Sequence, residues 1–206
     1  VRVSMDGMEL QDTPRTQRVI FSSGKDELVP LANFRHLQRR TLSGCNVEES
    51  GGDVGASDDA DLLVFAGPRK QFTTPEITAI KNHVAGGHSV LVMLAEGGEN
   101  ALGTNINYLL EEFGISVNED SVIRTVFLKY FHPKECLVQN GVVNREINRA
   151  AGKHVPGSSF DVEDEEDELA GEPVGGTTRA GQSLTFVYPY GATLSVQKPA
   201  VPVLSS

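Results

Sequence analysis

The chain has 206 residues and a mass of 22.2 kDa, enough for one domain with a real hydrophobic core. Its formal net charge is −10, but the acidic run at residues 161–168 contributes −7, which leaves −3 for the rest of the chain. Nucleic acid is therefore excluded as a general partner, because binding to phosphates needs a basic surface.

The cysteines and the ends of the chain indicate a cellular compartment. Cys45 and Cys136 lie far apart, and the sequence shows neither a secretory signal nor an apolar run of membrane-spanning length. We therefore expect a reduced, intracellular protein without membrane insertion. The first residues contain an internal Met5, so we interpret residues 1–17 as a tag and a disordered start.

The first part of the chain predicts a strand, a helix and a second strand. Residues 18–23, RVIFSS, are β-branched and aromatic and end at Gly24. Residues 28–42 have helical spacing of Leu31, Phe34 and Leu37, with a basic cluster on other faces, Arg35, Arg39 and Arg40. Residues 45–49 favour a short strand, and the Gly/Asp-rich residues 51–60 favour a loop.

A βαβ unit follows. Residues 62–65 and 90–94 are unbroken apolar runs, which suit strands of a parallel sheet. Between them Thr74 is predicted to cap a helix that carries Pro75 in its first turn and ends at Gly86. Two strands joined by one helix predict an α/β fold.

The second half alternates short elements with polar loops. Residues 95–100, AEGGEN, predict a tight turn, and a helix is expected from Asn105 to Gly114. Residues 143–153 look helical, with Ile147 facing inwards. The acidic, Gly-rich residues 157–181 predict a mobile loop. Residues 184–197 predict a hairpin, and residues 200–206 a last strand.

Several long motifs together resemble one known family. They are FAGPRKQFT, VLVMLAEGGE, TNINYLLEEFGISVN, KYFHPKE, NREINRAAGK and LTFVYPYGATLSVQKPAV. They resemble the amino-terminal GIFT domain of the intraflagellar transport protein 52 family, from about residue 18 to residue 206. The resemblance departs at the start, in residues 51–60 and in the acidic segment.

The resemblance implies a fold and a role. The fold is a flavodoxin-like or amidotransferase-like α/β domain over residues 18–206, with a mainly parallel sheet, helices on both faces and a β-hairpin extension. The implied role is a non-catalytic scaffold in complex B of intraflagellar transport, needed for assembly of the cilium or flagellum. No cofactor and no catalytic residue come with the family.

The resemblance also implies partners and a location. The partners are other complex B subunits, bound mostly through later parts of the full protein, and further the kinesin motor or cargo. The location is the cilium or flagellum and the basal body, on the cytoplasmic side. In the family another strand and helix follow residues 200–206, so we expect this chain to stop short of the end of its domain.

An enzyme of the amidotransferase or hydrolase type would need a nucleophile on a tight turn after a strand. The turns after the two apolar strands, AGPRKQFT and AEGGENALG, contain no such elbow. His132, Glu135 and Cys136 could share a face and bind zinc, but a zinc site needs three or four ligands and no second His/Cys pair accompanies them. We therefore expect a capped turn there, no metal and no catalysis.

Three other sets of residues remain open as binding sites. A small neutral ligand such as a sugar could bind Glu96, Glu99 and Asn100, although a plain turn is the simpler interpretation. A protein partner could bind a basic stripe, which is otherwise a solvated helix face, formed by Arg124, Lys129, Arg145, Arg149 and Lys153. An aromatic set is more typical of core than of interface: Tyr130, Phe131, Tyr188 and Tyr190. The acidic run 161–168 could screen the basic stripe, or it could be a spacer.

Overall fold

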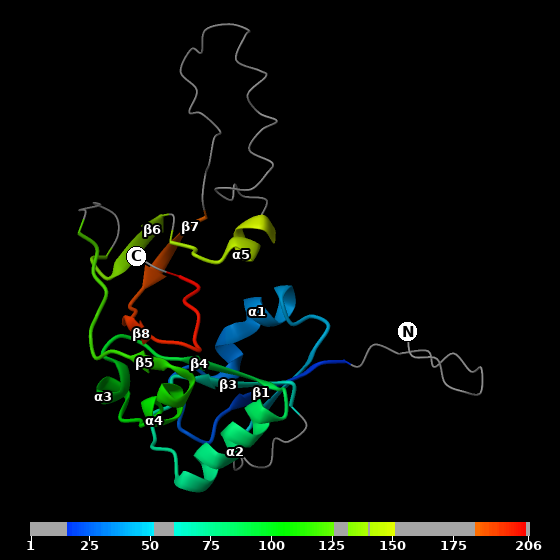
Figure 1. The fold of residues 1–206 in the computed structure, drawn as a ribbon. Helices are drawn as coiled ribbons and strands as arrows, with labels where there is room; N and C mark the ends of the chain where they lie inside the picture. The colour runs from blue at the N-terminus through cyan, green and yellow to red at the C-terminus, as the bar shows by residue number, and fades with distance from the viewer. Residues whose placement is uncertain (1–15, 52–59, 126–131, 140, 151–183, 205–206) are drawn as a thin grey trace, which may run out of the picture.

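The computed structural model describes residues 16–51, 60–125, 132–139, 141–150 and 184–204 (Figure 1). Its centre is a sheet of four strands, β1 (Arg18–Ser22), β2 (Asn46–Ser50), β3 (Leu62–Ala66) and β4 (Ser89–Met93). The strands lie in the order β2-β1-β3-β4, and all three neighbouring pairs are parallel. The predicted α/β class with a mainly parallel sheet is confirmed.

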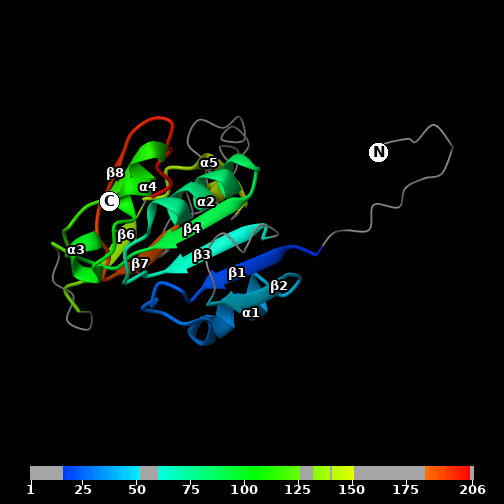
Figure 2. The ribbon, with the colours of Figure 1, turned by 90° about the horizontal axis from the view of Figure 1, so that it is seen from below.

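Helices cover both faces of this sheet (Figure 2). On one face, α2 (Thr74–Ala85) and α4 (Asn107–Leu110) contribute Ile80 and Leu109 to a core cluster that also holds Phe65 of β3. On the other face the 3₁₀ turn η1 (Leu31–Phe34) leads into α1 (Arg35–Arg40) and packs against Val64. Neighbouring residues of β3 thus face opposite clusters, which is why its apolar run is unbroken.

Helix α2 begins one residue earlier than its sequence suggests. The N-cap is Thr73 rather than Thr74, and Pro75 follows in the first turn. The backbone N–H and the hydroxyl of Thr73 both donate to Glu76 Oε2, at 2.7 and 2.8 Å. Thr73 and Thr74 both precede Pro75. Glu76 is the third residue after Thr73, and a glutamate at that position can bond back to the cap residue, which favours Thr73 as the N-cap.

The predicted long helix over residues 28–42 is wrong in length. The structure has η1 and the six-residue α1 instead, with Pro30 in an extended conformation immediately before them. Proline disfavours a helical conformation in the residue before it, here Val29, and the helical segment starts only after Pro30. Thr41 closes the last turn through a bond from its N–H to the carbonyl of Leu37, at 2.9 Å.

Two small antiparallel sheets replace the predicted hairpin over residues 184–197. Strand β7 (Thr185–Pro189) pairs with β6 (Glu135–Gln139), whereas β8 (Leu194–Val196) pairs with β5 (Ile115–Val117). The hairpin prediction is wrong because the residues between β7 and β8 bond to a distant segment. The carbonyls of Gly191 and Thr193 accept from the N–H groups of Val122 and Asn118, at 2.8 and 3.0 Å.

The remaining elements are short. A helix, α3 (Gly98–Leu102), replaces part of the turn expected after β4, and η3 (Glu111–Phe113) ends at Gly114. In the predicted helix over residues 143–153, α5 spans Arg145–Ala150, and Ile147 is exposed rather than facing inwards. The predicted last strand is wrong, because Leu204 makes only an isolated bridge to Val142.

Several expectations concern residues that the structure does not describe. The tag and start at residues 1–15, most of the loop over 51–60, and the acidic segment 157–181 lie outside the described residues. Among the helices of the described part, none is long and apolar enough to cross a membrane.

Candidate functional site

The carboxyl ends of β1 and β3 are the first place to look for a ligand. Open α/β sheets bind ligands where the strand order reverses. That point lies here between β1 and β3, because β2 is on one side of β1, and β3 and β4 are on the other. The two loops that follow these strands are bonded to each other. Leu28 N–H donates to the carbonyl of Gly67 at 2.8 Å, and Arg69 N–H donates to the carbonyl of Lys25 at 2.9 Å.

The side chain of Lys25 fills the space between these loops. Lys25 is only 7% exposed. Its Nζ lies 2.6 Å from Glu76 Oε1, donates to the carbonyl of Gln71 at 3.1 Å and stands 4.9 Å from the ring centre of Phe72. The ammonium group therefore contacts three groups of the protein itself. The position that binds ligands in other folds of this type is occupied by a structural ion pair.

The protonation of Glu76 follows from its contacts. Burial raises the pKa of Glu76, but hydrogen bonds from Lys25 and Thr73 outweigh it and hold that pKa below its ordinary value. Glu76 is thus a carboxylate at neutral pH and forms an ion pair with Lys25 Nζ. The pair joins the loop after β1 to the first turn of α2, and its contacts therefore support stability.

The candidate ligand residues after β4 are held by internal bonds. Glu96 accepts from Lys134 Nζ and from the hydroxyl of Ser121, with its carboxylate 2.6 Å from Lys134 at the nearest approach. The hydrogen bond from Lys134 holds the pKa of Glu96 below its usual range. Glu99 accepts from the backbone N–H of Asn107, and Asn100 is exposed on α3. The structure therefore directs the two carboxylates to different partners.

The sequence HPKEC forms a turn in which each polar group has a local role. His132 Nδ1 accepts from Lys134 N–H at 3.2 Å, and its ring stacks on Tyr190 with centres 5.4 Å apart. Glu135 Oε2 accepts from His132 N–H at 3.2 Å, while Cys136 is buried in β6. Among the described residues, no group of three or more His, Cys, Asp or Glu could hold a metal ion.

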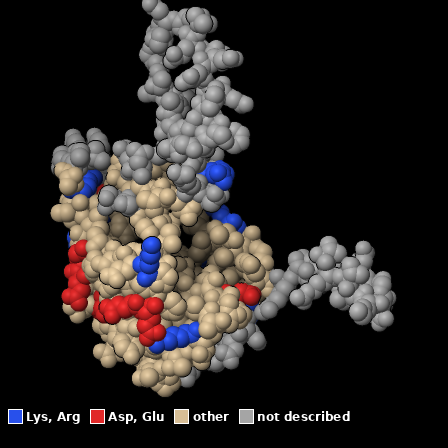
Figure 3. Space-filling view, in the orientation of Figure 1, with Lys and Arg blue, Asp and Glu red and all other residues tan. Residues whose placement is uncertain are grey.

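The basic stripe is only partly described. The backbone N–H of Arg124 donates to the carbonyl of Pro133 at 3.0 Å, and Arg149 is exposed on α5. The side chain of Arg145 and all of Lys129 and Lys153 lie outside the described part of the chain. The joint stripe therefore stays a prediction. Side chains of the opposite charge also gather on the surface: Figure 3 shows Asp and Glu over α3 and α4.

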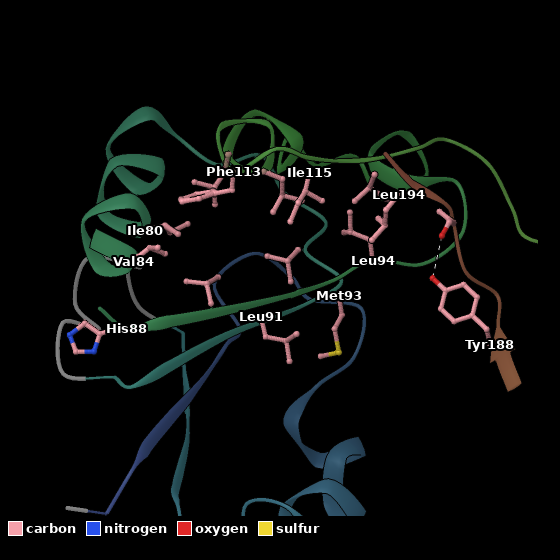
Figure 4. A pocket seen from close by; sticks show the side chains of 16 residues that line it. Ile80, Val84, His88, Leu91, Met93, Leu94, Phe113, Ile115, Tyr188 and Leu194 are labelled. Atoms are coloured by element: carbon pink, nitrogen blue, oxygen red, sulfur yellow. Dashed lines mark hydrogen bonds between the residues drawn. The ribbon is translucent and has the colours of Figure 1, made fainter. Parts of the chain in front are cut away.

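An apolar groove runs beside β4 (Figure 4). Its volume is about 690 Å³. β4 is the outermost strand of the sheet, and Leu91 is 41% exposed there. The groove's other walls come from α2, from the segment around η3 and from β8, where Leu194 faces Leu94. The walls are mostly apolar and can bury apolar surface, and His88 and Tyr188 are the titratable side chains among the lining residues.

Two features of the site are absent from the sequence-based expectations. The sequence does not predict the groove, because the apolar run over residues 90–94 resembles the buried run of β3 and no local signal distinguishes an edge strand. Lys25 carries one weak signal, since it follows Gly24 directly after the first strand. Its partner Glu76 is far away in the sequence, so only the folded chain brings the two together.

Comparison with known proteins defines the class and then the family. A solved structure described as the mmIFT52 N-terminal domain superposes with a TM-score of 0.71 at 41% identity, covering 91% of this chain and 72% of that one. The chain is therefore an α/β domain of the type seen in that structure. Residues 18–206 match the IFT52 GIFT domain family, and the chain belongs to this family.

Two curated relatives show how much of the longer proteins is represented. Both are described as intraflagellar transport protein 52 homolog. The one from Mus musculus is 46% identical over 191 residues, and the one from Homo sapiens is 45% identical over 191 residues. Each alignment covers 91% of this chain, which spans 42% and 41% of the length of the two relatives.

Proposed function

We propose that this chain is a non-catalytic interaction domain of an intraflagellar transport complex B subunit that serves in assembly of the cilium or flagellum. The observation that carries the proposal is the family match over residues 18–206, together with relatives named for intraflagellar transport at 45–46% identity. The proposed location is accordingly the cilium or flagellum and the basal body, on the cytoplasmic side.

The closed strand ends support a role without catalysis. Lys25 and Glu76 fill the space at the carboxyl ends of β1 and β3, and Glu96 after β4 is bonded to Lys134 and Ser121. These are the places where an enzyme of this architecture would present its reacting groups. Because Lys25 is paired with Glu76 and Glu96 with Lys134, we expect the domain to bind its partners through its outer surface.

The proposed partners are other complex B subunits and further the kinesin motor or cargo. The proposed contact surface is the basic stripe, which consists of Arg124, Lys129, Arg145, Arg149 and Lys153. Arginine suits such a surface, because its planar guanidinium forms two parallel hydrogen bonds with a carboxylate.

The experiment is a pull-down of the purified chain against separately purified complex B subunits and the kinesin motor. We expect one subunit to be retained by the wild-type chain and to bind more weakly to the double variant Arg145→Glu/Arg149→Glu. The control is Lys70→Glu/Lys198→Glu, which changes net charge equally at exposed lysines elsewhere.

Two results would contradict the proposed function, and a third would contradict its assignment to the basic stripe. Retention of none of the subunits or motor would remove the interaction role, and turnover of glutamine by the purified chain would remove the non-catalytic one. Equal weakening by both double variants would show that net charge, rather than the stripe, controls the binding.

A further inference from the structure

The outer face of α1 carries four basic or ionisable side chains. Arg35, His36, Arg39 and Arg40 are all exposed, and they stand in two pairs four residues apart, which places them on one side of the helix. The segment is anchored from the other side. The ring of Phe34 lies 5.2 Å from that of Phe21 in β1. The basic face is thus fixed to the sheet and directed away from it.

This face has no counter-ion in the described part of the chain. The described ion pairs engage a different set of cations: Arg18, Lys25, Arg69, Lys81 and Lys134. No described ion pair or side-chain hydrogen bond involves Arg35, Arg39 or Arg40. In a chain with a formal charge of −10, three unmatched arginines on a six-residue helix form a local exception.

The fold explains only part of this concentration. Like charges four residues apart repel and destabilise a helix, so Arg35 and Arg39 weaken α1 rather than support it. The helix dipole favours cations only in the last turn, which accounts for Arg39 and Arg40 but leaves Arg35 unexplained. An anionic partner outside the domain would remove the repulsion.

We propose that the outer face of α1 binds a short acidic segment of a partner protein. This inference rests on the proposed role as an interaction domain, and it concerns a surface other than the basic stripe. Guanidinium groups bind carboxylates in a bidentate manner. Leu37, 37% exposed, borders the basic face and adds an apolar contact. Arginine with an exposed apolar residue is typical of protein interfaces.

The size of the face favours a short protein segment over an extended polyanion. A helix of six residues is about 9 Å long, which matches roughly three residues of an extended peptide. A nucleic acid or an anionic membrane would extend beyond this face. The rest of the chain has a negative formal charge, which disfavours both.

The test measures fluorescence anisotropy of a labelled hexapeptide of four glutamates and two leucines with the purified chain. Its counterpart has lysine for glutamate. The variants are Arg35→Glu/Arg39→Glu and the control Lys70→Glu/Lys198→Glu, with the same net charge. We expect the α1 variant to bind the glutamate peptide about tenfold more weakly and the control to change less than about threefold. The α1 variant should also bind the lysine peptide more tightly than the control does.

Several outcomes would overturn the inference. They are equal loss in both double variants, no binding of the glutamate peptide by wild type, or tighter binding of a single-stranded oligonucleotide or phosphatidylserine vesicles than of the glutamate peptide. Far-UV circular dichroism checks that each variant is folded. Failure here, with a complex B subunit still retained in the pull-down, would remove only the assignment of α1 and leave the proposed function intact.

Discussion

The ion pair between Lys25 and Glu76 allows a quantitative prediction. Replacing Lys25 by methionine keeps an unbranched apolar stem of similar length but removes the ammonium. The change leaves the carboxylate of Glu76 in a site where the two side chains are only 9% and 15% exposed. It also removes the hydrogen bond to the carbonyl of Gln71 and the contact over the ring of Phe72.

The expected loss of stability follows from these contacts. Removing one partner of a buried ion pair costs about 3–5 kcal/mol, because the remaining charge has no compensation. Glu76 keeps the two hydrogen bonds from Thr73, so we expect the lower end, about 3 kcal/mol. Glu76→Gln retains an acceptor for the cap and removes only the charge. The double variant should therefore cost about 2 kcal/mol less than the sum of the single ones.

Urea unfolding followed by far-UV circular dichroism measures these differences, since the chain contains no tryptophan for fluorescence. With a slope of about 2 kcal/mol per molar urea, Lys25→Met should lower the midpoint by about 1.5 M. A loss below about 0.5 kcal/mol, or single effects that simply add in the double variant, would show that the pair is solvated and does not close the strand ends.

Two further predictions test loop anchoring and acid stability. The side chain of Asn105 bonds both the N–H and the carbonyl of Phe72, at 2.7 and 3.0 Å. Asn105→Ala should therefore lower the free energy of unfolding by about 2 kcal/mol, and Asn105→Asp by less. Urea midpoints measure both costs, and equal costs would contradict the prediction. The folded pKa of Glu96 is lowered, chiefly by Lys134, so its stabilisation is complete above the unfolded value of 4.5 and is lost as pH falls through the folded pKa. The urea midpoint should thus fall more steeply from about pH 5 to about pH 3 in wild type than in Glu96→Gln, and parallel curves would refute this.

Much of the candidate site lay beyond the reach of sequence patterns. The motif HPKEC and the loop AEGGEN were found as candidates, but their roles depend on partners such as Ser121 and Tyr190, which come from other parts of the chain. The groove beside β4 depends on which strand ends the sheet. The hairpin predicted for residues 184–197 shows the same limit. Apolar alternation indicates a strand but does not determine which strand pairs with it, and β7 and β8 pair with β6 and β5 rather than with each other.

The sequence by itself determined the α/β class, the βαβ unit and the end of α2 at Gly86. These features follow from local rules, since apolar spacing, caps and proline act within a few residues. Only the tertiary structure decided that Lys25 meets Glu76, that β4 is an edge strand and that the basic face of α1 has no counter-ion among the described residues. Such contacts join residues far apart in the chain. They form only when all the packing, hydrogen bonds and loop closures of the domain are satisfied together.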